Sequence, residues 1–459
     1  MDFGERKRSV CPESQETEKT DRISNLPDEI LGHILSFVPT KYAVAASILS
    51  SRWKDLYKLT TNLDFDDSLS IHPQFRLGTP DRSSCFRKFV DRVLDQCKKS
   101  QITRFRLKCA KHVKKDLVTD WINVALSSYK VPELELSVKL GVPFALQLPA
   151  VARRNLKVLK LDCNFILRVP KLVTFPCLKI LFFKQIEFPG DSLNGILSGC
   201  PLLEELVIIG CDWNGSDLFF SNPLLKKLTL DVGIGGVLDQ VSGSSIHFNL
   251  PSLVYLKYIE SLPEQYFITN LDSVVDAHFE VAFNDEEFED QQELCDIMVD
   301  VIFGISNCEI LYLSRQCLEA LASGDFALPA FQNLTQLKLG QGCNVSWNHV
   351  LLRFLNKSPC LESLTLVQVN TNDELDDDCL FGDHPVPSCV SSCLKVINLK
   401  NFAGLKEEMG MVEYFLEKAN DLEQMVIHWR KRNGASEKEI EIEIEKLPRA
   451  SKTSSISFK

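Results

Sequence analysis

Histidine and cysteine are the residue types in this sequence that are best suited to chemistry, as metal ligands, proton carriers or nucleophiles. The 8 histidines are isolated, and none forms the HExxH pair that places two imidazoles on one face of a helix. The 16 cysteines are scattered from Cys11 to Cys393 without a CxxC motif. The closest pair, Cys389 and Cys393, has a spacing that is more often structural than zinc-binding. We therefore expect no metal, no cofactor, and reduced thiols packed in a core.

Catalytic and phosphate-binding motifs are also missing from the sequence. The glycines between Gly233 and Gly236 lack the GxGxxG or Walker spacing, so they indicate a turn rather than a phosphate cradle. No acid, base and nucleophile stand in a recognisable arrangement. A net charge of -11 disfavours a nucleic-acid backbone as the main partner, because phosphate binding needs clustered Lys and Arg. The sequence thus predicts a protein that binds another protein, and an enzyme is the weaker class.

The length and the first residues constrain the organisation of the chain. A chain of 459 residues is too long for one ordinary core and suits either two or three domains or one repeat array. The segment 1–20 has no apolar h-region and is expected to be a disordered tail, in which the basic residues up to Arg8 are a weak nuclear-import signal. No stretch reaches the about 18 apolar residues of a membrane helix. We expect a location in the cytoplasm, the nucleus or both.

The elements that could position a binding site begin with three short helices between residues 21 and 57. Pro27 suits a first helical turn, Pro39 ends the first helix at about Val38, and Ser50 can cap the third helix. One neighbouring surface rarely needs as wide an apolar stripe as the first helix carries. The surplus face either contacts another protein or packs on the following domain, and periodicity alone leaves both open. On a helical wheel the stripe covers about 160° and contains Phe37, Ile30, Ile34, Val38, Leu31 and Leu35.

These helices resemble the F-box of plant F-box proteins. The resemblance rests on the runs 21–31, 35–41 and 48–54. It implies that a Leu-Pro pair and the apolar face after it dock a Skp-type adaptor, which bridges to a cullin. Leu49 and Trp53 are implied to hold the helices together. The adaptor contacts implied by the resemblance are Leu26, Pro27, Ile30, Leu31, Ile34 and Pro39.

A Leu-x-x-Leu-x-Leu pattern recurs through most of the remaining sequence. Its spacing matches the leucine-rich period of about 20 to 29 residues wherever no copy is missing. Longer gaps are expected to hide degenerate copies, for instance near Val274 and Leu311. Strict copies begin at Leu156, Leu203, Leu225, Leu334 and Leu361, and looser copies begin at Ile102, Leu178, Leu253, Leu394 and Leu422.

The residues that precede several of these strands repeat as well. The segment 196–204 aligns with 354–362 and 415–423, and each reads as a helix end, a capping residue and a turn into a strand. Each unit is therefore expected to hold one strand and one helix, neither of which can bury its apolar side alone. Stacked units predict an α/β fold, a right-handed leucine-rich-repeat solenoid preceded by a small three-helix F-box module.

Strand residues that alternate with the leucines must point away from the core. In neighbouring copies these positions bring Phe182, Val207 and Ile209 together, flanked by Lys160 and Lys184. An exposed apolar cluster often marks a contact site, so we hypothesise that these five residues bind a protein substrate. A loop or a helix that covers them is an equally simple alternative.

The end of the sequence, residues 392–459, resembles the FBD region that follows leucine-rich repeats in plant F-box proteins. We expect it to hold the last repeats and an end cap, with a helix over 439–445 and a short final strand that contains Ile456 and Phe458. The matching segments are 393–397, 414–419, 422–425 and 447–451. Two acidic inserts, 285–296 and 373–378, are expected to be solvated loops, and a basic partner is the less common meaning of such runs.

The expected organisation is a tail (1–20), an F-box (21–68), a solenoid (69–391) and FBD-type repeats with a cap (392–459). By resemblance, the chain is the substrate-recognition subunit of a Skp/cullin/F-box ubiquitin ligase, with the repeats capturing a protein for ubiquitination. Two alternatives stay open. The chain could bind partners outside any cullin ligase, or its solenoid could seat a small molecule as a co-receptor.

Overall fold

The structure is a computed structural model. The residues it describes are 23, 25–69, 82–98, 100–109, 113–139, 143–146, 154–168, 174–231, 245–261, 265–282, 291–322, 324, 326–340, 347–367, 385–430 and 436–459. The expected tail at 1–20, the glycine turn at 233–236, the acidic insert at 373–378 and residues 285–290 of the other insert lie outside them. No helix in the described part of the chain is long and apolar enough to cross a membrane.

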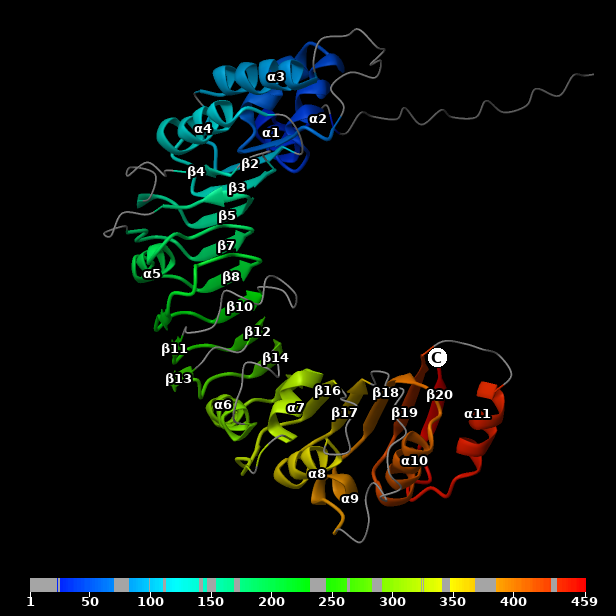
Figure 1. The fold of residues 1–459 in the computed structure, drawn as a ribbon. Coiled ribbons are helices and arrows are strands. Elements are labelled where there is room, and N and C mark those ends of the chain that lie inside the picture. Colours follow the sequence, from blue (N-terminus) through cyan, green and yellow to red (C-terminus); the bar gives the residue numbers. More distant parts are fainter. Residues whose placement is uncertain are drawn as a thin grey trace, which may run out of the picture.

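Fifteen parallel strands form one continuous sheet that curves into an arc, with its helices on the outer side (Figure 1). Each strand pairs with its neighbour in register, as Leu206 pairs with Leu228 and Leu228 with Leu256. The array therefore has the leucine-rich-repeat architecture that the sequence predicts. The strands are β1 Asn62–Asp66, β2 Arg104–Cys109, β3 Glu133–Val138, β5 Val158–Cys163, β7 Ile180–Lys184, β8 Glu205–Ile209, β10 Lys227–Asp231, β12 Tyr255–Ser261, β14 Asp276–Ala282, β15 Ile310–Leu313, β16 Gln336–Gly340, β17 Ser363–Val367, β18 Val396–Phe402, β19 Gln424–Trp429 and β20 Ser455–Phe458.

The leucine positions of the repeat form the core of this array. The last two apolar residues of every predicted copy, such as Leu159 and Leu161, are buried between the sheet and the outer layer. The degenerate copies expected near Val274 and Leu311 are the strands β14 and β15. Because adjacent repeats bury each other's apolar faces, the core is continuous from one end of the arc to the other.

The expectation of one strand plus one helix in every unit is wrong for the central repeats. There the outer layer is a second parallel sheet of three strands, β9 Leu218–Ser221, β11 Ser245–Asn249 and β13 Gln265–Thr269. The reason is local, since Ile246 and Phe248 alternate with exposed or half-buried residues at the period of a strand. Two short strands, β4 Phe144–Ala145 and β6 Phe165–Ile166, pair in the same way.

Helices cover the other repeats, and they include the helix ends expected before β8, β17 and β19. Their bounds are α3 Arg82–Gln96, α4 Lys115–Asn123 with a π-helical turn Val124–Ser128 (η3), α5 Ser192–Ser198, α6 Gln291–Gly304, α7 Arg315–Ala322, α8 Trp347–Lys357, α9 Ser388–Ser392, α10 Lys406–Lys418 and α11 Ser436–Lys446. The expectation of a terminal helix followed by a short strand is confirmed. In α11 Ile444 is fully buried, and β20 pairs with β19 as the last strand of the sheet.

The three expected N-terminal helices are α1 Asp28–Leu35, α2 Thr40–Ala45 and the 3₁₀ helix η2 Arg52–Leu59. A short 3₁₀ turn, η1 Ala46–Ile48, extends α2. Pro27 precedes α1 and Pro39 precedes α2, so both prolines begin a helix and need no backbone donor. The Arg52 guanidinium contacts the Asp28 carboxylate at 2.8 Å and thereby ties η2 to the start of α1.

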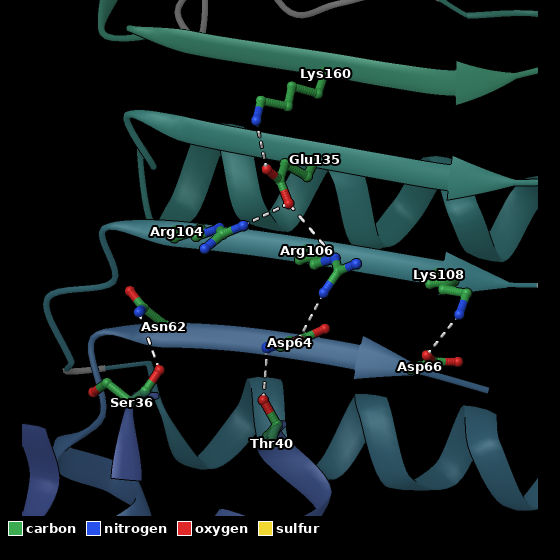
Figure 2. Close-up of polar contacts among 10 residues, drawn as sticks. All are labelled: Ser36, Thr40, Asn62, Asp64, Asp66, Arg104, Arg106, Lys108, Glu135 and Lys160. Atoms are coloured by element: carbon green, nitrogen blue, oxygen red, sulfur yellow. Dashed lines mark hydrogen bonds and ion pairs between the residues drawn. The ribbon is translucent and has the colours of Figure 1, made fainter. Parts of the chain in front are cut away.

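The N-terminal helices are continuous with the solenoid. Strand β1, which the expected boundary at residue 68 assigned to the F-box, pairs with β2 as the first strand of the sheet. The backbone N–H of Thr61 donates to Ser36 Oγ at 2.9 Å. Figure 2 shows two further links, in which the Asn62 side chain donates to the Ser36 carbonyl and the N–H of Asp64 donates to Thr40 Oγ1. The side chain of Phe65 is buried between the rings of Phe89 and Phe105. The first repeat and the helices therefore share one packed core.

An ion-pair ladder covers the inner face of the first four strands (Figure 2). The Glu135 carboxylate on β3 forms ion pairs with three cationic side chains. Its oxygens lie 2.7 Å from a guanidinium nitrogen of Arg104, 3.5 Å from one of Arg106 and 3.3 Å from the Lys160 ammonium. Arg106 also reaches Asp64 on β1 at 3.4 Å. Burial alone would raise the pKa of Glu135, but the hydrogen bonds from Arg104 and Lys160 outweigh it and hold that pKa below its ordinary value. The ionised carboxylate is thus the stabilising form.

Replacing this carboxylate, Glu135→Ala, is expected to reduce the free energy of unfolding by about 1 to 2 kcal/mol near pH 7, since its partners are partly exposed and screened. The folded-state pKa is depressed, so the contribution is present above the unfolded pKa and is lost as pH falls through the folded value. Urea titrations at about pH 7 and about pH 3 should show the difference from wild type shrinking in acid. Glu133→Ala, on the same strand, is the matched control because Glu133 forms no ion pair with a described residue. An equal loss in both variants would contradict the ladder's role.

Candidate protein-docking site

The apolar stripe of α1 is divided between two environments. Leu31, Gly32 and Leu35 face inward and are buried. Gly32 lets α1 approach η2 closely, because a Cβ at this position would lie 2.6 Å from the Cβ of Leu59. The inner half of the stripe therefore packs on the helix that follows, which accounts for part of the width seen in the sequence.

The outer half of the stripe is exposed to solvent. Ile30 is 46% exposed, Ile34 is 45% exposed and Phe37 is 73% exposed. These residues are spaced by four and three positions, so they lie on one face as the chain continues its turn beyond Leu35. The ring of Phe37 packs edge-on against His33 at 4.9 Å. We call Ile30, Ile34 and Phe37 the α1 apolar face. No described part of the solenoid covers it, so among the described residues it does not pack on the following domain.

The predicted adaptor contacts differ in their exposure to solvent. Pro27 is exposed next to the α1 apolar face, whereas Leu26 and Pro39 are partly buried. Leu31 is fully buried, so its side chain belongs to the internal core and not to a docking surface. The expectation that Leu31 contacts the adaptor is therefore corrected. Leu31 lies on the side of the stripe that faces η2, and the sequence alone does not show where η2 packs.

The two residues expected to hold the helices together also differ. Trp53 is half-buried and packs on the core, in agreement with that expectation. Leu49 is 67% exposed, so it does not hold the helices together. It lies in the turn between η1 and η2, next to Ile48, which is 86% exposed and which sequence reasoning missed. The adjacent apolar residues Ile48 and Leu49, which lie in a turn, could have indicated this additional exposed surface from the sequence.

The sheet brings together all five residues predicted to bind a substrate. Lys160, Phe182 and Val207 occupy one row across β5, β7 and β8, and Lys184 pairs with Ile209 in the next row. All five side chains are half-buried on the inner face of the arc. Each lysine has an acidic partner, since Lys160 contacts Glu135 at 3.3 Å and Lys184 contacts Asp162 at 3.6 Å. Phe182, Val207 and Ile209 therefore form an uncharged centre between the two ion-paired lysines.

One member of the cysteine pair singled out in the sequence belongs to the core, and the other, Cys393, is partly exposed. Cys389 is buried in α9, where its thiol lies 3.1 Å from the carbonyl oxygen of Leu355 and its burial raises its pKa to about 12. Within the described ranges, no three His, Cys, Asp or Glu side chains are grouped as a metal site requires.

A cavity of about 660 Å³ lies on the outer side of the sheet, where the helix α5 gives way to the strand β9. Asn194, Phe219 and Asn222 contribute to its lining. The core residues Leu203 and Leu206 also reach it, so it is on the opposite side of the sheet from Phe182 and Val207.

Three protein families match separate parts of the chain. Residues 23–56, which carry the α1 apolar face, match the F-box domain. Residues 118–261 match the LRR repeats of the FBD-associated F-box protein At5g56370, and residues 383–427 match the FBD family. The order of the matches follows the order of modules in the fold.

Several relatives match this chain over most of its length. The F-box/LRR-repeat protein At4g14096 of Arabidopsis thaliana is 32% identical over 93% of this chain and 92% of its own length. The F-box/LRR-repeat protein At3g59200 is 32% identical over 94% of this chain and 86% of its own length, and the F-box protein At3g59000 is 33% identical over 89% and 86%. The chain therefore belongs to the F-box/LRR/FBD protein family.

Proposed function

We propose that this chain is the substrate-recognition subunit of a Skp/cullin/F-box ubiquitin ligase. The observation that carries the proposal is the α1 apolar face, which exposes two isoleucines and a phenylalanine within the segment that matches the F-box domain. Three large apolar side chains on one face rarely remain in water, and they suit the docking of a Skp-type adaptor. Leu26, Pro27 and Pro39 lie at the edges of the same helices and would complete the contact.

The proposed mechanism is tethering. The N-terminal helices hold the adaptor and through it the cullin, while the repeat array holds a protein whose lysines are modified by the ubiquitin-conjugating enzyme. The N-terminal helices and the repeats share one hydrophobic core, and Thr40 on α2 is hydrogen-bonded to β1. This keeps the two binding regions on one body and favours a defined distance between them. Tethering raises the effective concentration of the substrate, and this chain contributes no bond-making step.

The experiment that tests the ligase assignment is co-purification of the full chain from plant cells under low-salt conditions. Capture of both a Skp-type adaptor and a cullin supports it. Capture of the adaptor without a cullin favours a binding protein that acts outside the ligase, and capture of neither overturns the assignment. Quantitative comparison with and without a proteasome inhibitor identifies proteins that accumulate on the chain when their degradation is blocked.

The inner-face residues Phe182, Val207 and Ile209, with Lys160 and Lys184, are the proposed substrate contact. Changing Phe182 and Ile209 together to aspartate is expected to weaken substrate capture by at least about tenfold, because a central apolar anchor is replaced by charge. The readout is the set of proteins enriched by affinity purification in the presence of a proteasome inhibitor.

The matched control for this variant is Phe267→Asp with Ile442→Asp, which makes the same chemical changes at exposed sites on β13 and α11. Circular dichroism establishes that both variants keep the wild-type fold. Unchanged substrate capture by a folded Phe182→Asp/Ile209→Asp variant would show that the substrate binds elsewhere.

A further inference from the structure

The inner face changes its charge character along the arc. Toward the N-terminus its cations are paired, as Lys108 pairs with Asp66 at 3.1 Å, Lys184 with Asp162 at 3.6 Å and Lys257 with Asp231 at 3.6 Å. The strands from β15 to β20 differ. Their inward-facing residues include lysines and a histidine and no carboxylate: Ile310, Tyr312, Gln336, Lys338, Gly340, Ser363, Thr365, Val367, Val396, Asn398, Lys400, Gln424, Val426, His428, Ser455, Ser457 and, just after β20, Lys459.

The pairing of the strands aligns two of the lysines and the histidine side by side. Lys400 on β18 is directly opposite His428 on β19. The N–H of Lys459 donates to the carbonyl of Ile427 at 2.9 Å, and the N–H of Trp429 donates to the carbonyl of Lys459 at 3.0 Å, so Lys459 continues the row next to His428. Burial and the charges of Lys459 and Lys400 lower the pKa of His428, so its imidazole is neutral near pH 7 and lies between the two lysines.

Lys338 on β16 lies on the same face in the neighbouring row, which it shares with Thr365 and Asn398. It has no carboxylate partner in the described part of the chain, and its ammonium lies over the Tyr312 ring at 4.4 Å. Burial lowers its pKa and the charge of Lys400 lowers it further, while the charge of Glu280 acts in the opposite direction. Glu280 is on β14, where its carboxylate lies 3.6 Å from His278. We call Lys400, His428 and Lys459, together with Lys338 in the neighbouring row, the cationic row.

The lysines of the cationic row form no ion pair with a carboxylate of the described chain. Lys400 and Lys459 are exposed and form no ion pair with a described residue. The hydroxyl of Ser457, which lies on the same face, is buried without a hydrogen-bond partner. In a chain whose net charge is -11, an unpaired row of cations beside an unsatisfied donor is unusual and suits a ligand that brings carboxylates.

We infer that the cationic row binds an acidic, extended segment of a partner protein. Crossing from β16 to β20 covers about 20 Å, which about six extended residues span. Acidic side chains of such a segment would meet Lys338 at one end and Lys400 and Lys459 at the other. The overall negative charge of the chain opposes a long polyanion such as nucleic acid, whose binding needs many phosphate contacts. The inference rests on the proposed function for its biological meaning, because it names the chemistry of the substrate.

Fluorescence anisotropy with the purified full chain tests this inference. The probe is a fluorescein-labelled peptide of about eight residues rich in Glu and Asp, and a Lys-rich peptide of equal length is the negative probe. The variant Lys338→Glu/Lys400→Glu is expected to bind the acidic peptide about tenfold to a hundredfold more weakly, since two attractive contacts become repulsive. Wild-type affinity should also fall as salt concentration rises.

The control variant is Lys88→Glu/Lys115→Glu, which makes the same change in net charge on exposed positions of α3 and α4. Equal weakening by both variants would reduce the effect to overall charge and overturn the cationic row as a site. Failure of the wild-type chain to bind the acidic peptide, or tighter binding of a single-stranded oligonucleotide that displaces it, would also overturn the inference. Co-purification of the Skp-type adaptor is measured on the same samples. Loss of adaptor binding argues against the proposed function. Normal adaptor binding together with a failure to bind the acidic peptide argues against the cationic row alone.

Discussion

Changing Ile30 and Ile34 together to aspartate is expected to abolish capture of a Skp-type adaptor, with a loss of affinity of at least about a hundredfold. Both side chains are nearly half exposed in the free chain, so the substitution removes little internal packing. In the proposed complex each isoleucine would be buried, which contributes about 1.5 to 3 kcal/mol relative to exposure. An aspartate at the same position would also lose its hydration without gaining a partner. The readout is the dissociation constant of the purified full chain for the adaptor.

The matched control for the docking surface is Ile442→Asp. Ile442 is 51% exposed on α11, at the opposite end of the arc (Figure 1), so the change adds a charge to a similar apolar position far from the α1 apolar face. Adaptor binding of this variant should equal that of wild type. Urea unfolding of both variants checks that neither has lost its fold. Wild-type adaptor affinity in a folded Ile30→Asp/Ile34→Asp variant would refute the assignment of this face.

Phe65→Ala is expected to destabilise the N-terminal end of the array by about 3 to 5 kcal/mol. The ring is fully buried on β1, with centroid distances of 6.0 Å to Phe89 and 5.8 Å to Phe105, and its removal leaves a cavity that these rings cannot easily close. Because each repeat contacts only its neighbours, the loss should concentrate in the first repeats rather than spread through the array. Hydrogen exchange should accelerate most in β1 and β2 and in the helices packed on them.

The same variant is expected to weaken adaptor binding without altering the docking surface. The helices that carry Ile30 and Ile34 are anchored to β1 through Ser36 and Thr40, so local unfolding of β1 reduces the fraction of chains that can bind. Phe303→Ala is the matched control, since Phe303 is 51% exposed and its truncation should cost less than about 0.5 kcal/mol. Equal effects of the two truncations on urea unfolding and hydrogen exchange would contradict a shared core at this junction.

The sequence by itself determined the features that depend on local pattern. Copies of Leu-x-x-Leu-x-Leu predicted ten of the parallel strands, since alternating residues in a strand must separate a buried side from an exposed one. Pro27 marked the start of α1 and Pro39 marked the break after it, and the helical spacing of Ile440 and Ile444 predicted α11 although Glu and Ile alternate there as in a strand. Resemblance to the F-box family identified the segment that carries the α1 apolar face.

Only the tertiary structure decided which part of each apolar stripe remains exposed. Leu31 and Ile30 are neighbours on the same helix, yet one is buried against η2 and the other faces solvent, because burial depends on a segment more than twenty residues later in the chain. Leu49 is exposed for the corresponding reason, since nothing in the described core reaches its turn.

The local sequence pattern also could not predict which residues of different repeats lie side by side. Lys400, His428 and Lys459 come from three strands, and only the register of those strands places them in one row. The lysines at 160 and 184 look the same in sequence as those at 338 and 400, but stacking gives the first two acidic partners and leaves the last two without any in the described chain. The physical reason is that charge interactions depend on separation in space, which the stacking of repeats sets and which no single repeat contains.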